Sequence, residues 1–104
     1  MKQERIDALK GMLAVDPNDG FALYGLALDY KADGLLEEAL PLLERAALLE
    51  DPLLYTFYQL GEVLIGLGED LDAVEALRKG ALRAQEAGDM KALNEFEVLL
   101  STID

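Results

Sequence analysis

The chain has 104 residues, of which 52% are hydrophobic and 29% charged, a composition that predicts one small folded domain and not a disordered tail. Its formal net charge is −12, which argues against nucleic acid and anionic membrane surfaces as partners, because both are bound through clustered Lys and Arg. The chain contains neither Cys nor His, which excludes disulfides, thiolate nucleophiles and the commonest general base and metal ligand. We therefore expect a protein that is not an enzyme and that holds no cofactor and no metal ion.

The N-terminal residues include no apolar run of the length that a signal peptide needs. The longest apolar runs elsewhere are a handful of residues, whereas a membrane-spanning helix needs about 20. We expect a cytoplasmic protein, and the lack of Cys agrees with a reducing compartment.

Apolar residues recur at helical spacing in six segments of the chain. The segments span residues 3–15, 20–32, 35–50, 53–67, 69–87 and 90–103. Asp16 and Pro17 end the first segment, since Pro disfavours helix in the residue before it. Gly34 is suited to a left-handed cap at the end of the second. Pro41 lies inside the third segment, which we still expect to be helical because its apolar pattern continues past this residue.

Later breaks follow the same logic. Pro52 precedes the fourth segment, Gly68 ends it, and Gly88 ends the fifth, with Asp89 placed to cap the last helix. No stretch alternates with period two for long enough to be a strand. The prediction is an all-α protein of about six antiparallel helices in three hairpins, because short connections make neighbouring helices antiparallel.

The chain also repeats itself. Residues 21–49, moved forward by 34 positions, align with residues 55–83. The identical pairs are Tyr24 and Tyr58, Leu26 and Leu60, Gly34 and Gly68, Ala39 and Ala73, Leu43 and Leu77, Ala47 and Ala81, and Leu48 and Leu82. A fixed period in this range indicates a repeat architecture, in which helical hairpins stack because one hairpin cannot bury its apolar face alone.

The repeats resemble tetratricopeptide repeats, a family of 34-residue helix-turn-helix units with a set order of small and large residues. The pattern is carried by Leu23, Leu26, Ala27, Tyr30, Ala39 and Leu43, and by Phe57, Leu60, Gly61, Leu64, Ala73 and Leu77. The family's Trp is absent, and its closing Pro is displaced by one residue at Pro52. The resemblance implies an α-α superhelix and a single domain over residues 1–104. Its expected parts are a half-repeat helix at 3–19, repeats at 20–52 and 53–87, and a capping helix at 88–104.

In this family the first helix of each repeat lines a concave groove that holds a peptide or a partner helix. The sides of those helices that face away from the core stripe carry Phe21, Tyr24, Leu28 and Lys31, and Tyr55, Tyr58, Glu62 and Ile65. An exposed helix side is normally polar, whereas these sides are largely aromatic or aliphatic, and Tyr is favoured at recognition sites. The alternative is that these side chains are core, covered by the N-terminal helix, by the last helix or by a second copy of the chain.

The hypothesis is a non-catalytic module that binds a peptide or partner-protein segment in this groove, with Lys31 and Glu62 setting the orientation of the segment. The alternative is a self-assembling structural module, such as a homodimer. In that case an exposed repeat face or the C-terminal helix would pair with another copy.

Overall fold

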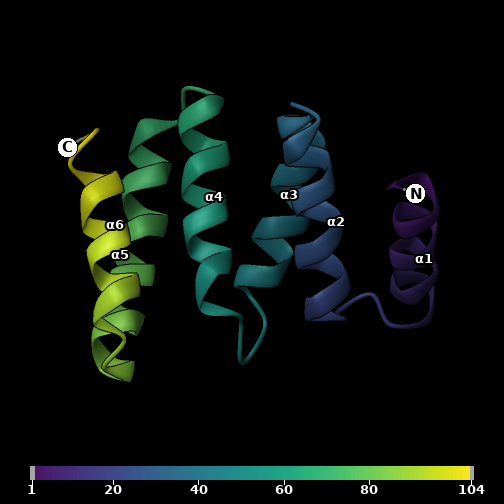
Figure 1. Ribbon diagram of the computed structural model, residues 1–104, viewed down its shortest axis with the longest axis horizontal. Helices are drawn as coiled ribbons and strands as arrows, with labels where there is room; N and C mark the ends of the chain where they lie inside the picture. The colour runs from purple at the N-terminus through teal and green to yellow at the C-terminus, as the bar shows by residue number, and fades with distance from the viewer. Residues whose placement is uncertain (1, 104) are drawn as a thin grey trace. The chain divides into compact units, whose positions relative to one another are not determined.

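The computed structural model describes residues 2–103, which form six α-helices and no strand and so confirm the all-α prediction (Figure 1). The helices are α1 (Lys2–Val15), α2 (Gly20–Ala32), α3 (Leu36–Ala47), α4 (Leu54–Gly66), α5 (Asp70–Ala87) and α6 (Met90–Leu100). As predicted, α3 continues through Pro41.

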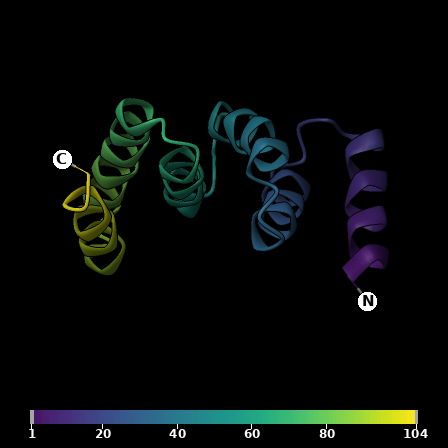
Figure 2. The same cartoon turned by 90° about the horizontal axis from the view of Figure 1, so that it is seen from above.

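The helices pack in two compact units. The N-terminal unit ends at Leu53 and contains α1, α2 and α3, with α2 packed against both of the others. The C-terminal unit begins at Leu54 and contains α4, α5 and α6, with α5 packed against both of the others. Consecutive helices within a unit run antiparallel (Figures 1 and 2). Each unit is therefore a group of three helices built around its middle one.

Two helices end three residues earlier than predicted. α3 stops at Ala47 and not at residue 50, because the backbone N–H of Leu48 bonds to the carbonyl three residues back, in a tighter turn. α6 stops at Leu100 and not at residue 103, where the hydroxyl of Ser101 donates to the carbonyl of Val98 at 2.6 Å. Such side-chain bonds to nearby carbonyls compete with the helical pattern.

The turn between the two helices of each repeat has the same backbone structure in both repeats. Gly34 and Gly68 both adopt left-handed conformations, with φ of 75° and 79°, which a residue without Cβ adopts readily. The backbone hydrogen bonds around them are equivalent: Leu35 N to Tyr30 O (2.9 Å) and Glu69 N to Leu64 O (2.8 Å), and Gly34 N to Lys31 O (2.9 Å) and Gly68 N to Ile65 O (3.0 Å). The 34-residue period of the sequence is thus also a period of the backbone at these turns.

The turn between α5 and α6 also contains a glycine in the left-handed conformation. Gly88 has φ of 71°, and the N–H of Asp89 bonds to the carbonyl of Ala84 at 2.9 Å. The Asp89 carboxylate then accepts from the N–H of Ala92 at 3.0 Å, which confirms its predicted role as the N-cap of the last helix.

The core also follows the repeat. The buried equivalent pairs include Leu23 and Phe57, Leu26 and Leu60, Ala27 and Gly61, Ala39 and Ala73, Leu43 and Leu77, and Ala46 and Gly80. The two glycines of these pairs, Gly61 and Gly80, lie at close approaches between helices. A Cβ built on Gly61 would lie 2.6 Å from Cγ of Leu77, which is too close for two carbon atoms. The alternation of small and large residues in the sequence therefore corresponds to close helix packing.

An ion pair joins the first two helices of the N-terminal unit. Arg5 of α1 donates two hydrogen bonds to Asp29 of α2, one of them from Nε to Oδ2 at 2.9 Å. Asp29 is buried, with 7% of its surface exposed, so a fork of two charge-assisted bonds offsets the cost of burying its charge. These hydrogen bonds lower the pKa of Asp29 below its ordinary value.

Asp29→Asn is expected to make the stability of the N-terminal unit depend less on pH in the acid range. The pKa of Asp29 is lower in the folded state, so its contribution is fully present above the unfolded value of about 3.9. That contribution is lost as the pH falls through the lower folded value. Urea unfolding at neutral pH should show the variant to be less stable than the wild type, and the difference should shrink in acid. Glu44→Gln, which removes an exposed carboxylate from α3 of the same unit, is the control. A difference that stays constant with pH would contradict this role for Asp29.

Candidate functional site

The predicted site residues of α4 lie on one side of that helix and are partly exposed. They are Tyr55, Tyr58, Glu62 and Ile65. The opposite stripe of α4 is buried and carries Phe57, Leu60 and Leu64. The helix therefore separates a side that forms the core from a side that solvent reaches in part, as the spacing of these residues predicted.

The two tyrosines of α4 form an aromatic cluster with Phe96 of α6. The ring centroids of Tyr55 and Phe96 are 6.4 Å apart and the rings are nearly parallel, with an interplanar angle of 20°. Tyr58 meets Phe96 edge-on at 5.7 Å and 70°, and it meets Tyr55 at 6.2 Å and 65°. Phe96 is fully buried, whereas both tyrosines keep part of their surface exposed. Phe96 thus supports the two rings, and these geometries are the ones that aromatic pairs favour.

Carboxylates lie beside this cluster. The Tyr55 hydroxyl donates to Oε1 of Glu95 on α6 at 2.8 Å. Burial, together with the charges of Glu62 and Glu95, raises the pKa of the Tyr58 phenol above its ordinary value. Burial is the largest cause of this shift, and the two carboxylates add to it because a nearby negative charge disfavours the phenolate.

The other four predicted residues lie on α2, in the N-terminal unit. Phe21 in its first turn is 69% exposed, and Tyr24, Leu28 and Lys31 are half-buried. Asp19 positions the start of this helix, because its carboxylate accepts from the N–H of Ala22 at 3.1 Å. Phe21 is therefore an exposed aromatic residue in the first turn of α2, directly before the buried Ala22 and Leu23.

Phe96 of the aromatic cluster and Glu95 beside it were not predicted as site residues. Phe96 is one of the apolar residues of the last predicted segment, 90–103, but helical spacing alone does not show which side chains of another helix it meets. Glu95 gave no signal in the sequence, since it is one of 21 acidic residues. Only the packing of α6 onto α5 brings both residues to the tyrosines of α4.

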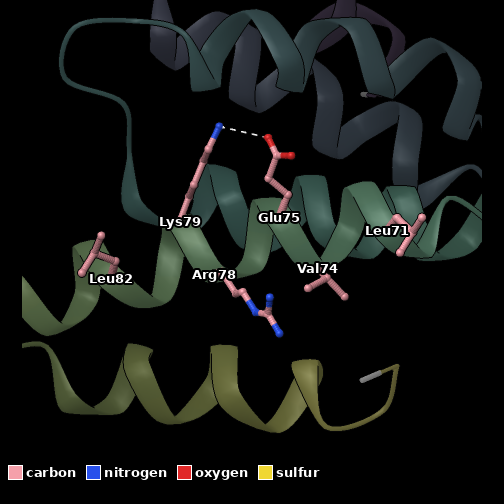
Figure 3. Close-up of a pocket in the computed structure, with 6 residues that line it drawn as sticks. All are labelled: Leu71, Val74, Glu75, Arg78, Lys79 and Leu82. Atoms are coloured by element: carbon pink, nitrogen blue, oxygen red, sulfur yellow. Dashed lines mark ion pairs between the residues drawn. The ribbon is translucent and has the colours of Figure 1, made fainter.

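A second surface feature, a hollow of about 510 Å³, lies along α5 (Figure 3). Its lining residues are Leu71, Val74, Glu75, Arg78, Lys79 and Leu82, all from this one helix. Glu75 and Lys79 form an ion pair at 3.3 Å on one side of the row, and Val74 and Arg78 lie on the other side (Figure 3). Leu71 at one end is 89% exposed. The hollow is an open groove along the surface of one helix. The aromatic cluster differs from it because two helices, α4 and α6, supply its residues.

Within residues 2–103, no group of three or more acidic side chains is placed to hold a metal ion. None of the helices in that range combines the length and the apolar character needed to cross a membrane. Comparison with models of known protein families, with curated proteins and with solved structures found no match. The resemblance to tetratricopeptide repeats therefore stays a prediction based on the chain's own residues.

Proposed function

We propose that this chain is a non-catalytic interaction module of the tetratricopeptide type, whose helices stack as an α-α superhelix and whose α2 and α4 hold a segment of a partner protein. The proposed contact residues are Phe21, Tyr24, Leu28, Lys31, Tyr55, Tyr58, Glu62 and Ile65. The repeat character is supported by the equivalent turns at Gly34 and Gly68, and by the equivalent buried positions of the two repeats.

The observation that carries the proposal is the position of Tyr24 and Tyr58. The two tyrosines are 34 residues apart, and each is half-buried on the side of a helix whose other side forms the core. Neither tyrosine belongs to the buried stripe of its helix, which carries Leu23 and Leu26 in α2 and Phe57 and Leu60 in α4. Tyr is among the residues that supply most of the binding energy in protein interfaces.

Tyr24→Ala combined with Tyr58→Ala is expected to abolish capture of the partner while leaving the helices intact. Truncating one tyrosine at the centre of an interface typically costs about 2 kcal/mol or more, which corresponds to about 30-fold in affinity. The measurement is quantitative mass spectrometry of proteins captured from a lysate by the wild type and by the double variant. Circular dichroism confirms that both have the same helix content.

Leu48→Ala combined with Val98→Ala is the matched control, because it removes two apolar side chains that are 86% and 58% exposed and lie outside the proposed contacts. This control should capture the same partner as the wild type. Equal capture by the tyrosine double variant would overturn the proposed site.

A second candidate function is self-assembly through α6, which is favoured by the exposed side chains of Met90 and Val98 on that helix. Sedimentation over a range of protein concentrations separates the two candidates. A monomer supports partner binding by the single chain. A stable dimer that Met90→Gln with Val98→Gln dissociates would support self-assembly instead.

A further inference from the structure

The aromatic cluster of the C-terminal unit has the geometry of a corner. Tyr55 and Phe96 are nearly parallel, at 20°, whereas Tyr58 stands at 65° to the first ring and at 70° to the second. Phe96 is fully buried and packs against both tyrosines, which are partly exposed. A side chain that enters this corner would contact the face of one ring and the edge of another.

The rim of this corner is acidic. Glu95 is held beside Tyr55 by the hydroxyl that donates to it at 2.8 Å. Glu62 lies on α4 one turn after Tyr58. A carboxylate that accepts a hydrogen bond from a neutral hydroxyl keeps its negative charge, so this contact fixes the position of the charge without cancelling it. Both carboxylates lie close enough to the Tyr58 ring to add to the rise of its pKa, of which burial is the largest cause.

Two basic side chains of α5, Arg83 and Lys79, contact other side chains of the C-terminal unit. The guanidinium of Arg83 lies 5.1 Å from the centroid of the Phe57 ring, and Lys79 pairs with Glu75 at 3.3 Å. The contact between Arg83 and Phe57 also shows that this fold already pairs an arginine with an aromatic ring. Rings attract cations placed over their faces, and the attraction is stronger where water is excluded.

The charge of the whole chain acts in the same direction. It carries 21 acidic residues and nine basic ones. A strongly negative protein attracts a positively charged partner over distances up to about the Debye length of 8 Å at physiological salt, and it repels an acidic one. Long-range attraction and the local acidic rim therefore favour the same kind of ligand.

We propose that the partner segment bound by this protein is basic, and that one of its arginine side chains enters the corner between Tyr55 and Tyr58, with Glu62 and Glu95 at its rim. This inference rests on the proposed function and identifies the class of segment. Arginine fits better than lysine because a planar guanidinium stacks on a ring and donates two parallel hydrogen bonds to a carboxylate, whereas an ammonium is a compact point charge.

The test begins with a random peptide library displayed on phage and selected on the wild-type protein. Peptides whose binding is lost in the Tyr24→Ala and Tyr58→Ala double variant are then synthesised. The selected peptides are expected to be enriched in Arg. Replacing the critical Arg by citrulline, which keeps the shape and removes the charge, should weaken binding at least about tenfold, or 1.4 kcal/mol.

Glu62→Gln with Glu95→Gln should reduce the preference for Arg over citrulline by a similar factor. Glu86→Gln with Glu97→Gln changes the net charge by the same amount at two exposed positions and should leave the preference unchanged. A spectroscopic titration should also show that the bound Arg peptide lowers the pKa of Tyr58, because a cation stabilises the phenolate.

The outcomes are distinguishable. If the tyrosine-dependent peptides lack basic residues, or bind equally well with citrulline, the proposal that the partner segment is basic is wrong. The proposed function would still stand. An equal loss of preference in both Glu double variants would overturn the assignment to this corner, because net charge alone would then explain it. A selection that yields no tyrosine-dependent peptide would overturn the proposed function itself.

Discussion

Gly80→Ala is expected to destabilise the C-terminal unit by about 1–3 kcal/mol, although Ala is the better helix former by about 1 kcal/mol. Gly80 is buried in α5, where α4 and α6 both approach the helix. A Cβ at this position would overlap Cε1 and Cζ of the Phe96 ring and would lie 2.8 Å from Cβ of Phe57. The Phe57 atom is next to the backbone and cannot rotate away, so the helices themselves would have to separate.

Gly11→Ala is the matched control for this substitution. Gly11 lies inside α1, and a Cβ built there meets nothing within 4 Å, so the same change should be neutral or stabilising by about 0.5–1 kcal/mol. Urea unfolding gives the two free energies, and hydrogen exchange of the α5 and α6 amides locates the effect. A Gly80→Ala protein as stable as the wild type would show that the helices do not approach as closely as the structure has them.

Gly61 provides an intermediate case. The atoms that its added Cβ would meet are Cγ, Cδ1 and Cδ2 of Leu77, which can move by a change of rotamer, unlike the Cβ of Phe57. Ala27 already occupies the equivalent position of the first repeat. Gly61→Ala should therefore cost less than Gly80→Ala.

The helices and the turns between them were predictable because their signals are local. Gly34 has the left-handed conformation that its place after an apolar segment indicated, and Gly68 and Gly88, which were predicted only as helix ends, share it. The buried positions followed from helical spacing and from the 34-residue period. Helix ends were less predictable, since the hydroxyl of Ser101 can either extend a helix or terminate it, and the sequence does not distinguish the two.

The candidate site was predictable only in part, because its remaining members come from elsewhere in the chain. The side of α4 that carries Tyr55 and Tyr58 followed from spacing. Glu95 lies 40 residues after the tyrosine that it contacts, and no periodicity links the two. Arg5 and Asp29, which are 24 residues apart, are a second example. Contacts between side chains on different helices depend on how the helices are turned relative to each other.

Phe96→Ala is expected to have the largest effect on stability of any truncation in the C-terminal unit, about 3–5 kcal/mol, because deleting a buried ring loses its transfer free energy and leaves a cavity. Phe96 is fully buried and contacts both tyrosines. Phe96→Leu keeps much of the volume and should cost less. It should also relieve part of the overlap in a Gly80→Ala background, so the two changes together should cost less than the sum of their separate effects.

Phe96→Leu also tests whether the aromatic cluster serves the site as well as the fold. Without the ring at its back, Tyr58 should become more solvated, and its pKa should fall toward the ordinary value because burial is the largest cause of the shift. If Phe96 only fills the core, peptide binding should follow the stability of each variant. If it holds the tyrosine rings in place for a partner, Phe96→Leu should weaken peptide binding at temperatures where the variant is fully folded. Urea unfolding, a titration followed by tyrosine absorbance and a binding isotherm on the same preparation distinguish these results. Unchanged affinity in folded Phe96→Leu protein would restrict Phe96 to a structural role.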